Sequence, residues 1–165
     1  MSPTLAGVAV AVVTVSDRSS RGERADASGP VLADALREWG ASVVVSVVPD
    51  GADEVERVIR AAVAAGARVI ITTGGTGIGP RDLTPEGTSR VLARPLPGIA
   101  ERLRAVDADA VPGAVLSRGV AGLTAGDAPA IVINVPGSTG AARSAVAVLG
   151  AVLPHALAQL TGEDH

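Results

Sequence analysis

The stretch GVAVAVVTV at residues 7–15 decides the fold class. It is an almost unbroken apolar run rich in β-branched valine, the pattern of a strand that is covered on both faces. Similar runs predict further strands at residues 43–48, 68–73 and 130–135. Segments with helical periodicity alternate with these strands, and such alternation produces a mainly parallel sheet through right-handed crossovers. The sequence therefore predicts an α/β fold with three layers, α/β/α.

Apolar residues at helical spacing, bounded by proline and glycine, predict the helices between the strands. The expected helices cover residues 30–39, 55–63, 85–93, 97–106 and 139–150. Thr84 and Ser138 are expected to cap two of them, and Pro154 is expected to kink or restart the last. Residues 16–29 read as a polar, arginine-rich loop, and residues 114–116 as a short strand.

Length and composition limit the class of protein. A chain of 165 residues suits one domain, expected over 1–165 with a core over about 7–160. Trp39 is the only aromatic residue, so the core must consist of valine, leucine, isoleucine and alanine. Scattered arginines and a net charge of −3 argue against nucleic acid binding. No apolar run near 18 residues and no signal-like N-terminus is visible, so we expect a cytoplasmic protein without a membrane span.

Missing residue types exclude several mechanisms. Every basic residue other than histidine is arginine, and the chain has no lysine and no cysteine. A P-loop and a Schiff base need lysine, and thiol nucleophiles and cysteine-rich zinc sites need sulfur. His155 and His165 lie far along the chain from every glycine-rich segment, which argues against a Ser-His-Asp hydrolase. Any chemistry must use carboxylates, hydroxyls, arginine and backbone amides, with or without a hard metal ion.

Polar residues follow four of the expected strands. In chain order they are Thr14, Ser16 and Asp17, then Asp50, then the stretch TTGGTGIGPRD at 72–82, and then NVPGST at 134–139. In open parallel sheets, ligands bind at the carboxyl ends of the strands. The four segments are therefore expected to meet along one edge of the sheet.

Four glycines occupy six positions at 74–79, directly after a buried strand. Backbone N–H groups of such a loop can surround a phosphate without obstruction by side chains. The spacing GGxGxG differs from the GxGxxG of dinucleotide-binding folds, and a P-loop would need lysine. An anion-binding loop is the interpretation, and a plain glycine-rich turn is the alternative.

Two carboxylates flank this loop in the expected arrangement. Asp50 and Asp82 each follow a strand end, so together they are expected to hold one Mg²⁺ against the phosphates of a nucleotide. The alternative is that Asp50 caps the following helix and Asp82 belongs to a turn.

Other polar residues have two interpretations each. Ser138 either binds a second anion or only caps a helix. Ser117 with Arg118 either binds a phosphate or a pterin edge, or lies in a surface ion pair. The loop with Asp17, Asp26 and three arginines either closes over a substrate or is simply solvated.

The stretch TTGGTGIGPRDLTPE at 72–86 resembles the Mog and MoaB family of molybdenum-cofactor proteins, which includes the gephyrin G domain. Other similar segments follow in the family's order: TVSDR (14–18), DASG (26–29), VPD (48–50), PGIAE (97–101), LSRGVAG (116–122) and INVPGST (133–139). The resemblance covers about residues 8–160.

The resemblance implies a molybdopterin-binding α/β fold, commonly a homotrimer, in transient contact with other molybdenum-cofactor proteins. It also implies a molybdopterin adenylyltransferase, which uses Mg²⁺ and ATP to transfer AMP to the terminal phosphate of molybdopterin and releases pyrophosphate. Asp50 and Asp82 would be the essential acids and the metal ligands. The candidate substrate contacts are Thr14, Ser16, Asp17, Asp26, Gly74, Gly75, Thr76, Gly77, Arg81, Thr84, Ser117, Arg118, Asn134, Pro136, Gly137 and Ser138.

Two subtypes of the family share these segments. The segments PGST and GAARSAV, at 136–146, resemble the MoaB type, whereas INVPG and GPRDLTPE look more like the adenylylating Mog type. A non-catalytic, MoaB-type molybdopterin carrier or scaffold is therefore the alternative. Because both acidic positions are aspartate, the enzyme is the preferred interpretation, with direct attack on the α-phosphorus of ATP and no covalent enzyme intermediate.

Overall fold

A computed structural model describes residues 3–162, so His165 lies outside the described residues. Six strands form one sheet, in the order β2-β1-β3-β6-β5-β4. In chain order the strands are β1 (Ala9–Val15), β2 (Ser42–Val48), β3 (Val69–Thr73), β4 (Leu92–Pro95), β5 (Ala121–Thr124) and β6 (Ile131–Val135). Strands β2, β1, β3 and β6 run parallel, and β5 and β4 complete the sheet by antiparallel pairing. The mainly parallel sheet predicted from the sequence is confirmed.

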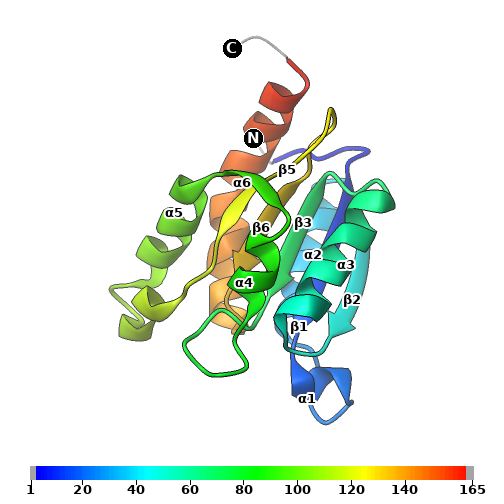
Figure 1. Cartoon of the computed structure of the whole chain (residues 1–165). Helices are drawn as coiled ribbons and strands as arrows, with labels where there is room; N and C mark the ends of the chain where they lie inside the picture. The colour runs from blue at the N-terminus through cyan, green and yellow to red at the C-terminus, as the bar shows by residue number, and fades with distance from the viewer. Residues whose placement is uncertain (1–2, 163–165) are drawn as a thin grey trace.

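Helices cover both faces of this sheet (Figure 1). They are α1 (Asp17–Ser20), α2 (Ser28–Glu38), α3 (Ala52–Ala64), α4 (Thr84–Ser89), α5 (Pro97–Asp107), the 3₁₀ helix η1 (Pro112–Leu116) and α6 (Thr139–Leu160). The core is divided accordingly. Helices α2, α5 and α6 pack on one face and α3 packs on the other, so the three predicted layers are present.

Alternate residues of the central strands supply the two halves of the core. Val12, Ile71 and Ile133 face the layer of α2 and α6, whereas Ile70 and Val132 face α3. All five are fully buried, which explains why the central strands read as continuous apolar runs. Burial of each such side chain contributes about 1.5–3 kcal/mol, so this sheet holds the site on a rigid base.

Two predicted elements between β3 and β6 are wrong. The helix expected at 85–93 ends at Ser89, and the chain then forms β4. The strand expected at 114–116 is instead part of the helix η1, which β5 follows. Both errors come from short segments. Four-residue strands at the antiparallel side of the sheet are defined by pairing with each other and with β6, which local periodicity does not reveal.

Helix boundaries differ from the prediction at three further places. The loop at 16–29 contains the short helix α1, capped by Ser16, and α2 already begins at Ser28. Leu83, not Thr84, occupies the cap position of α4. Helix α6 continues past residue 150 and through Pro154 to Leu160 without a restart.

Helix α6 is the one helix among the described residues that is long and apolar enough to cross a membrane by length and composition alone. Its residues Ala142, Ala145, Leu149 and Leu153 are buried in the core, where the helix packs against α2 and α5. The apolar character of α6 is thus accounted for by the core.

Candidate active site

The carboxyl ends of four parallel strands meet at one edge of the sheet. Thr14 of β1 pairs in register with Thr73 of β3, which pairs with Val135 of β6, and Val15 pairs with Val48 of β2. The four polar segments that follow these strands are therefore neighbours, as predicted. Two adjoining hollows lie at this edge, a smaller one of about 210 Å³ and a larger cleft of about 510 Å³. They share Gly74, Gly75, Asp82 and Gly137, so they form one continuous site.

The smaller hollow is polar. Its walls include the predicted residues Thr14, Ser16, Asp26, Asp50 and Asp82, together with Ser19, Arg24 and Ser28. The Thr14 hydroxyl donates a hydrogen bond of 2.7 Å to Asp26, whose other carboxylate oxygen accepts the N–H of Gly29 at 3.0 Å. Asp26 thus joins the end of β1 to the start of α2 and faces the hollow.

Asp50 is fixed by a reciprocal pair of hydrogen bonds. Its Oδ2 accepts the backbone N–H of Asp17 at 2.8 Å, and Asp17 Oδ1 accepts the backbone N–H of Asp50 at 3.1 Å. Arg81 donates to both carboxylate oxygens of Asp17 and to the carbonyl of Asp50. Asp50 therefore does not cap α3, whose cap position is Gly51. Asp17 and Arg81, predicted as substrate contacts, line neither hollow and instead position Asp50.

The surroundings of Asp50 perturb its titration. Burial raises the pKa of its carboxyl group, and the negative charges of Asp17 and Asp82 raise this pKa further. The hydrogen bond from the backbone N–H of Asp17 lowers it, but by less than burial raises it. The hydrogen bond from the Arg81 guanidinium lowers the pKa of Asp17, so Asp17 stays ionised as the anchor. A half-buried carboxylate beside other negative charges is a site where a cation is favoured.

Asp50 and Asp82 each retain one carboxylate oxygen for a ligand. Asp82 Oδ2 accepts the N–H of Gly79 at 2.9 Å, so Asp82 also belongs to a turn. Within residues 3–162 no hydrogen bond reaches Oδ1 of either aspartate, and both side chains line the smaller hollow. Two carboxylate oxygens, with water and phosphate oxygens completing an octahedron, are a donor set that fits Mg²⁺. No cluster of three or more metal-binding side chains occurs in the described part of the chain.

Four consecutive carbonyl groups of the glycine loop are bonded away from the hollows. The carbonyls of Gly74 and Gly75 accept from the hydroxyl and the N–H of Thr84, at 2.9 and 3.1 Å. Those of Thr76 and Gly77 accept from the N–H and the guanidinium of Arg118, at 2.8 Å each. Among the described residues, the N–H groups of Gly75, Thr76 and Gly77 have no hydrogen-bond partner. Free amides and tied carbonyls make this loop an anion-binding cradle.

Close packing explains two of the glycines in the loop. Gly74 has a φ of +102°, and a Cβ there would collide with the carbonyl oxygen of Val15. Gly75 has a φ of +66°, and a Cβ there would collide with the hydroxyl of Thr84. The loop can approach both β1 and its Thr84 support only because these side chains are absent.

Thr84 and Arg118 thus support the loop, and their role as substrate contacts stays a prediction. Neither side chain lines a hollow. The Arg118 guanidinium donates to the carbonyls of Gly77 and Asp82 and pairs with Glu86, and this contact lowers the pKa of Glu86. An arginine that is saturated by backbone and carboxylate oxygens has few donors left for a ligand.

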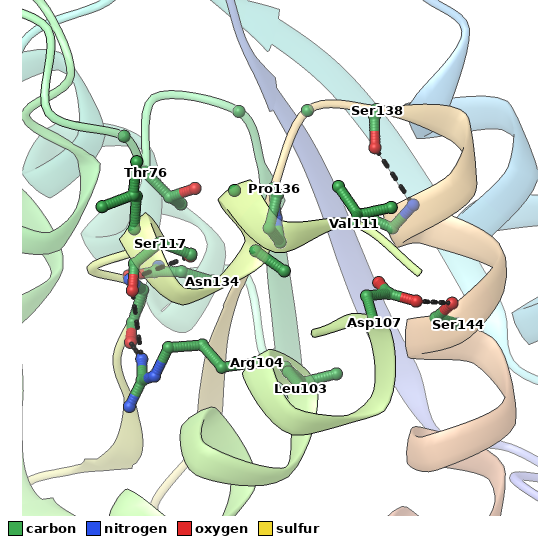
Figure 2. A pocket seen from close by; sticks show the side chains of 18 of the residues that line it. Thr76, Leu103, Arg104, Asp107, Val111, Ser117, Asn134, Pro136, Ser138 and Ser144 are labelled. Carbon is green, nitrogen blue, oxygen red and sulfur yellow. Dashed lines mark hydrogen bonds between the residues drawn. The ribbon is translucent and has the colours of Figure 1, made fainter. Parts of the chain in front are cut away.

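The larger cleft lies between the glycine loop, α5, η1 and the start of α6 (Figure 2). It brings together the predicted residues Thr76, Gly77, Ser117, Asn134, Pro136, Gly137 and Ser138. Its remaining wall was not predicted from the sequence and consists mainly of Ala100, Leu103, Arg104, Asp107, Val111, Leu116 and Ser144. This wall is largely apolar and suits a flat ring system.

Two predicted residues in this cleft have structural hydrogen bonds. Asn134 is buried, donates 2.9 Å bonds to the hydroxyls of Thr72 and Thr88, and accepts the N–H of Val120 at 3.1 Å. Ser138 caps α6, because its hydroxyl accepts the N–H of Ala141 at 3.1 Å, while it also lines the cleft (Figure 2). Asn134 therefore holds β6 to its neighbours beneath the cleft.

A family profile described as "Probable molybdopterin binding domain" matches residues 11–155. The chain belongs to this family. The matched range contains β1, the glycine loop, both aspartates and the start of α6, so the two hollows lie within the molybdopterin-binding domain.

Relatives and solved structures agree with the family. A molybdopterin adenylyltransferase of Pyrococcus furiosus is 36% identical over 88% of this chain and 87% of its own length. A molybdenum cofactor biosynthesis bifunctional protein of Synechococcus elongatus is 40% identical over 100% of this chain, which spans only 52% of that longer protein. The Mog protein structure from Mycobacterium ulcerans has a TM-score of 0.87 at 39% identity, covering 93% of this chain and 99% of its own. The predicted MoaB and Mog fold is confirmed.

Proposed function

We propose that this protein is a molybdopterin adenylyltransferase, which transfers AMP from ATP to the terminal phosphate of molybdopterin and releases pyrophosphate. The glycine loop carries the proposal, since its carbonyls are tied to Thr84 and Arg118 and its free N–H groups lie beside two aspartates. A relative that aligns over most of both chains bears this activity in its name, which supports the assignment.

Both substrates are anionic at the reacting end. The amides of Gly75, Thr76 and Gly77 are suited to the phosphates, and the larger cleft beside them is suited to a heterocyclic ring. Asp50 and Asp82 would hold Mg²⁺ through their Oδ1 atoms, to which no described residue donates a hydrogen bond. When bound, Mg²⁺ would neutralise phosphate charge and orient the phosphates for in-line displacement.

The reaction requires alignment rather than a nucleophile from the protein. A terminal phosphate oxygen of molybdopterin attacks the α-phosphorus of ATP, the bond to the bridging oxygen breaks, and pyrophosphate leaves with that electron pair. Negative charge spreads over the phosphoryl oxygens, where the loop amides lower the barrier by donating hydrogen bonds. A chain without lysine or cysteine is compatible with this route.

The test is a product assay with purified full-length protein, MgCl₂, ATP and molybdopterin. We expect adenylylated molybdopterin and pyrophosphate in equal amounts. Asp82→Asn and Asp50→Ala should each lower the rate at least about 100-fold, since each removes an electrostatic contact to the transition state. Asp127→Asn is the matched control, because it also removes one negative charge but lies in the exposed turn between β5 and β6.

One outcome would reject the enzyme, and another would reject the role of Asp82. If the wild-type chain binds molybdopterin without turnover and does not bind ATP with Mg²⁺ by calorimetry, it is the non-catalytic carrier. Equal rates for wild type and Asp82→Asn would show that this carboxylate has no part in the chemistry. A homotrimer is also proposed, from family resemblance, and sedimentation equilibrium measures it.

A further inference from the structure

Asp107 lies on the wall of the larger cleft, away from the two aspartates of the phosphate end. It is the last residue of α5, and its Oδ1 accepts a hydrogen bond of 2.6 Å from the hydroxyl of Ser144 in α6. Figure 2 shows the two side chains meeting in the cleft, with Leu103 and Val111 nearby. The resemblance to the family assigned no role to Asp107.

The carboxylate of Asp107 has unused acceptor capacity. Within residues 3–162 it belongs to no ion pair, and the Ser144 hydroxyl is its only hydrogen-bond donor. Arg104, one turn earlier on α5, donates instead to the carbonyls of Ser117 and Gly119. The last turn of a helix is an unfavourable place for a negative charge. A half-buried carboxylate held there without a cation is suited to receive donors from a ligand in the cleft.

The chemistry of an ionised carboxylate selects among ring systems. It can only accept hydrogen bonds, and it binds best two parallel N–H groups. A pterin carries such a pair, its 2-amino group and the adjacent N3–H. Adenine presents an amino group next to the N1 lone pair, which a carboxylate would repel. Asp107 therefore favours a pterin edge over an adenine edge.

The position of Asp107 also fits a pterin whose phosphate lies at the glycine loop. Ser144 is six residues beyond Ser138, the cap of α6 beside the loop, which corresponds to roughly 9 Å along the helix axis. Leu103 and Val111 line the cleft near Asp107 and provide apolar contact for the faces of a ring. A ring edge at Asp107 and a phosphate at the loop can thus be bound by one molecule.

We propose that Asp107 is the specificity-determining residue for the pterin ring, and accepts the 2-amino and N3–H donors in the larger cleft with Ser144 as its positioning residue. This inference rests on the proposed function, because it identifies the hollow in which molybdopterin binds.

The test compares two probe ligands that differ at one position of the ring. 6-Hydroxymethylpterin has the 2-amino donor, and 6-hydroxymethyllumazine has a 2-oxo acceptor in its place. Equilibrium dialysis with the wild-type chain should show the pterin bound about 10- to 100-fold more tightly, the range for lost hydrogen bonds to a charged group. Asp107→Asn offers one donor and one acceptor, so this preference should fall to less than about threefold or reverse. Asp109→Asn, an exposed change just beyond α5, should keep it.

Two results would overturn the inference: equal binding of both probes by the wild type, and an unchanged preference in Asp107→Asn. Ser144→Ala provides a second variant should Asp107→Asn not fold, and it should reduce the preference without removing it. The outcome is separable from the proposed function: a protein that prefers pterin but transfers no AMP keeps this inference and loses the proposed function.

Discussion

Replacement of Arg118 by methionine tests whether this arginine supports the glycine loop. The change removes hydrogen bonds to the carbonyls of Gly77 and Asp82, at 2.8 and 2.5 Å, and an ion pair with Glu86. A hydrogen bond to a charged group contributes about 1.5–3 kcal/mol, and an exposed ion pair about 0.2–1 kcal/mol. Because 38% of the Arg118 side chain is exposed, solvent screening reduces even the lower values, whose sum is about 3 kcal/mol, and we expect a loss of about 2–3 kcal/mol in the free energy of unfolding.

Urea denaturation followed by far-ultraviolet circular dichroism measures this loss. With a denaturant slope of about 2 kcal/mol per molar, the midpoint should fall by roughly 1–1.5 M. Arg118→Lys should recover little of it, since an ammonium group cannot reach two carbonyls and a carboxylate in one plane. Arg57→Met is the matched control. In the part of the chain that the structure describes, Arg57 pairs with Glu54 alone, on the surface of α3, so this change should leave the midpoint almost unchanged.

A double-mutant cycle with Glu86→Gln separates the ion pair from the backbone contacts. We expect a coupling of about 0.2–1 kcal/mol for the pair, with most of the loss remaining in the carbonyl contacts. If Arg118→Met leaves the urea midpoint unchanged but abolishes binding of ATP with Mg²⁺, the guanidinium is a ligand contact and our interpretation of the loop is refuted.

Three other variants probe the site. Gly75→Ala should destabilise the folded protein by about 1–3 kcal/mol and weaken nucleotide binding, because Gly75 has a φ of +66° and an added Cβ would meet Thr84. The control is Gly98→Ala in α5, where an added Cβ meets open space, and it should leave the calorimetric melting temperature unchanged. Asn134→Leu should cost about 3 kcal/mol or more in urea denaturation, since the buried hydroxyls of Thr72 and Thr88 and the partly buried N–H of Val120 lose their bonds; an unchanged midpoint contradicts this. Asp50→Asn should become more stable relative to the wild type as pH rises from about 4 to 7. Burial raises the pKa of the Asp50 carboxyl group in the folded protein. The stability that this group contributes is therefore present below the unfolded pKa of about 3.9 and is lost as pH rises through the folded pKa. Parallel profiles of the free energy of unfolding against pH for the two proteins would contradict this.

The sequence allowed the edge of the sheet to be predicted, because the periodicity of buried strands survives in the chain as runs of valine and isoleucine. Once β1, β2, β3 and β6 are parallel, their carboxyl ends must be neighbours, and Asp50 and Asp82 follow two of these ends. The short strands β4 and β5 were not predictable in this way, since only their partners in the sheet define them.

The direction of individual side chains could not be predicted. Arg118 follows Ser117 in a polar segment, and nothing in the sequence shows that its guanidinium turns toward the back of the loop while the serine faces the cleft. Asp107 was missed for a similar reason. Helical spacing in α5 shows which residues are apolar, and the acid at its last position becomes a site residue only through packing against Ser144.

The long helix α6 has a practical consequence for construction of chimeric proteins. It starts at the cleft and runs 22 residues, or about 33 Å, so that its last turn lies at the opposite end of the sheet, and the segment that leads into β1 lies at that end as well (Figure 1). An affinity tag, a fluorescent protein or another enzyme can therefore be attached at either side without covering the hollows. Natural chains in which this unit is about half of a bifunctional protein are compatible with the same arrangement.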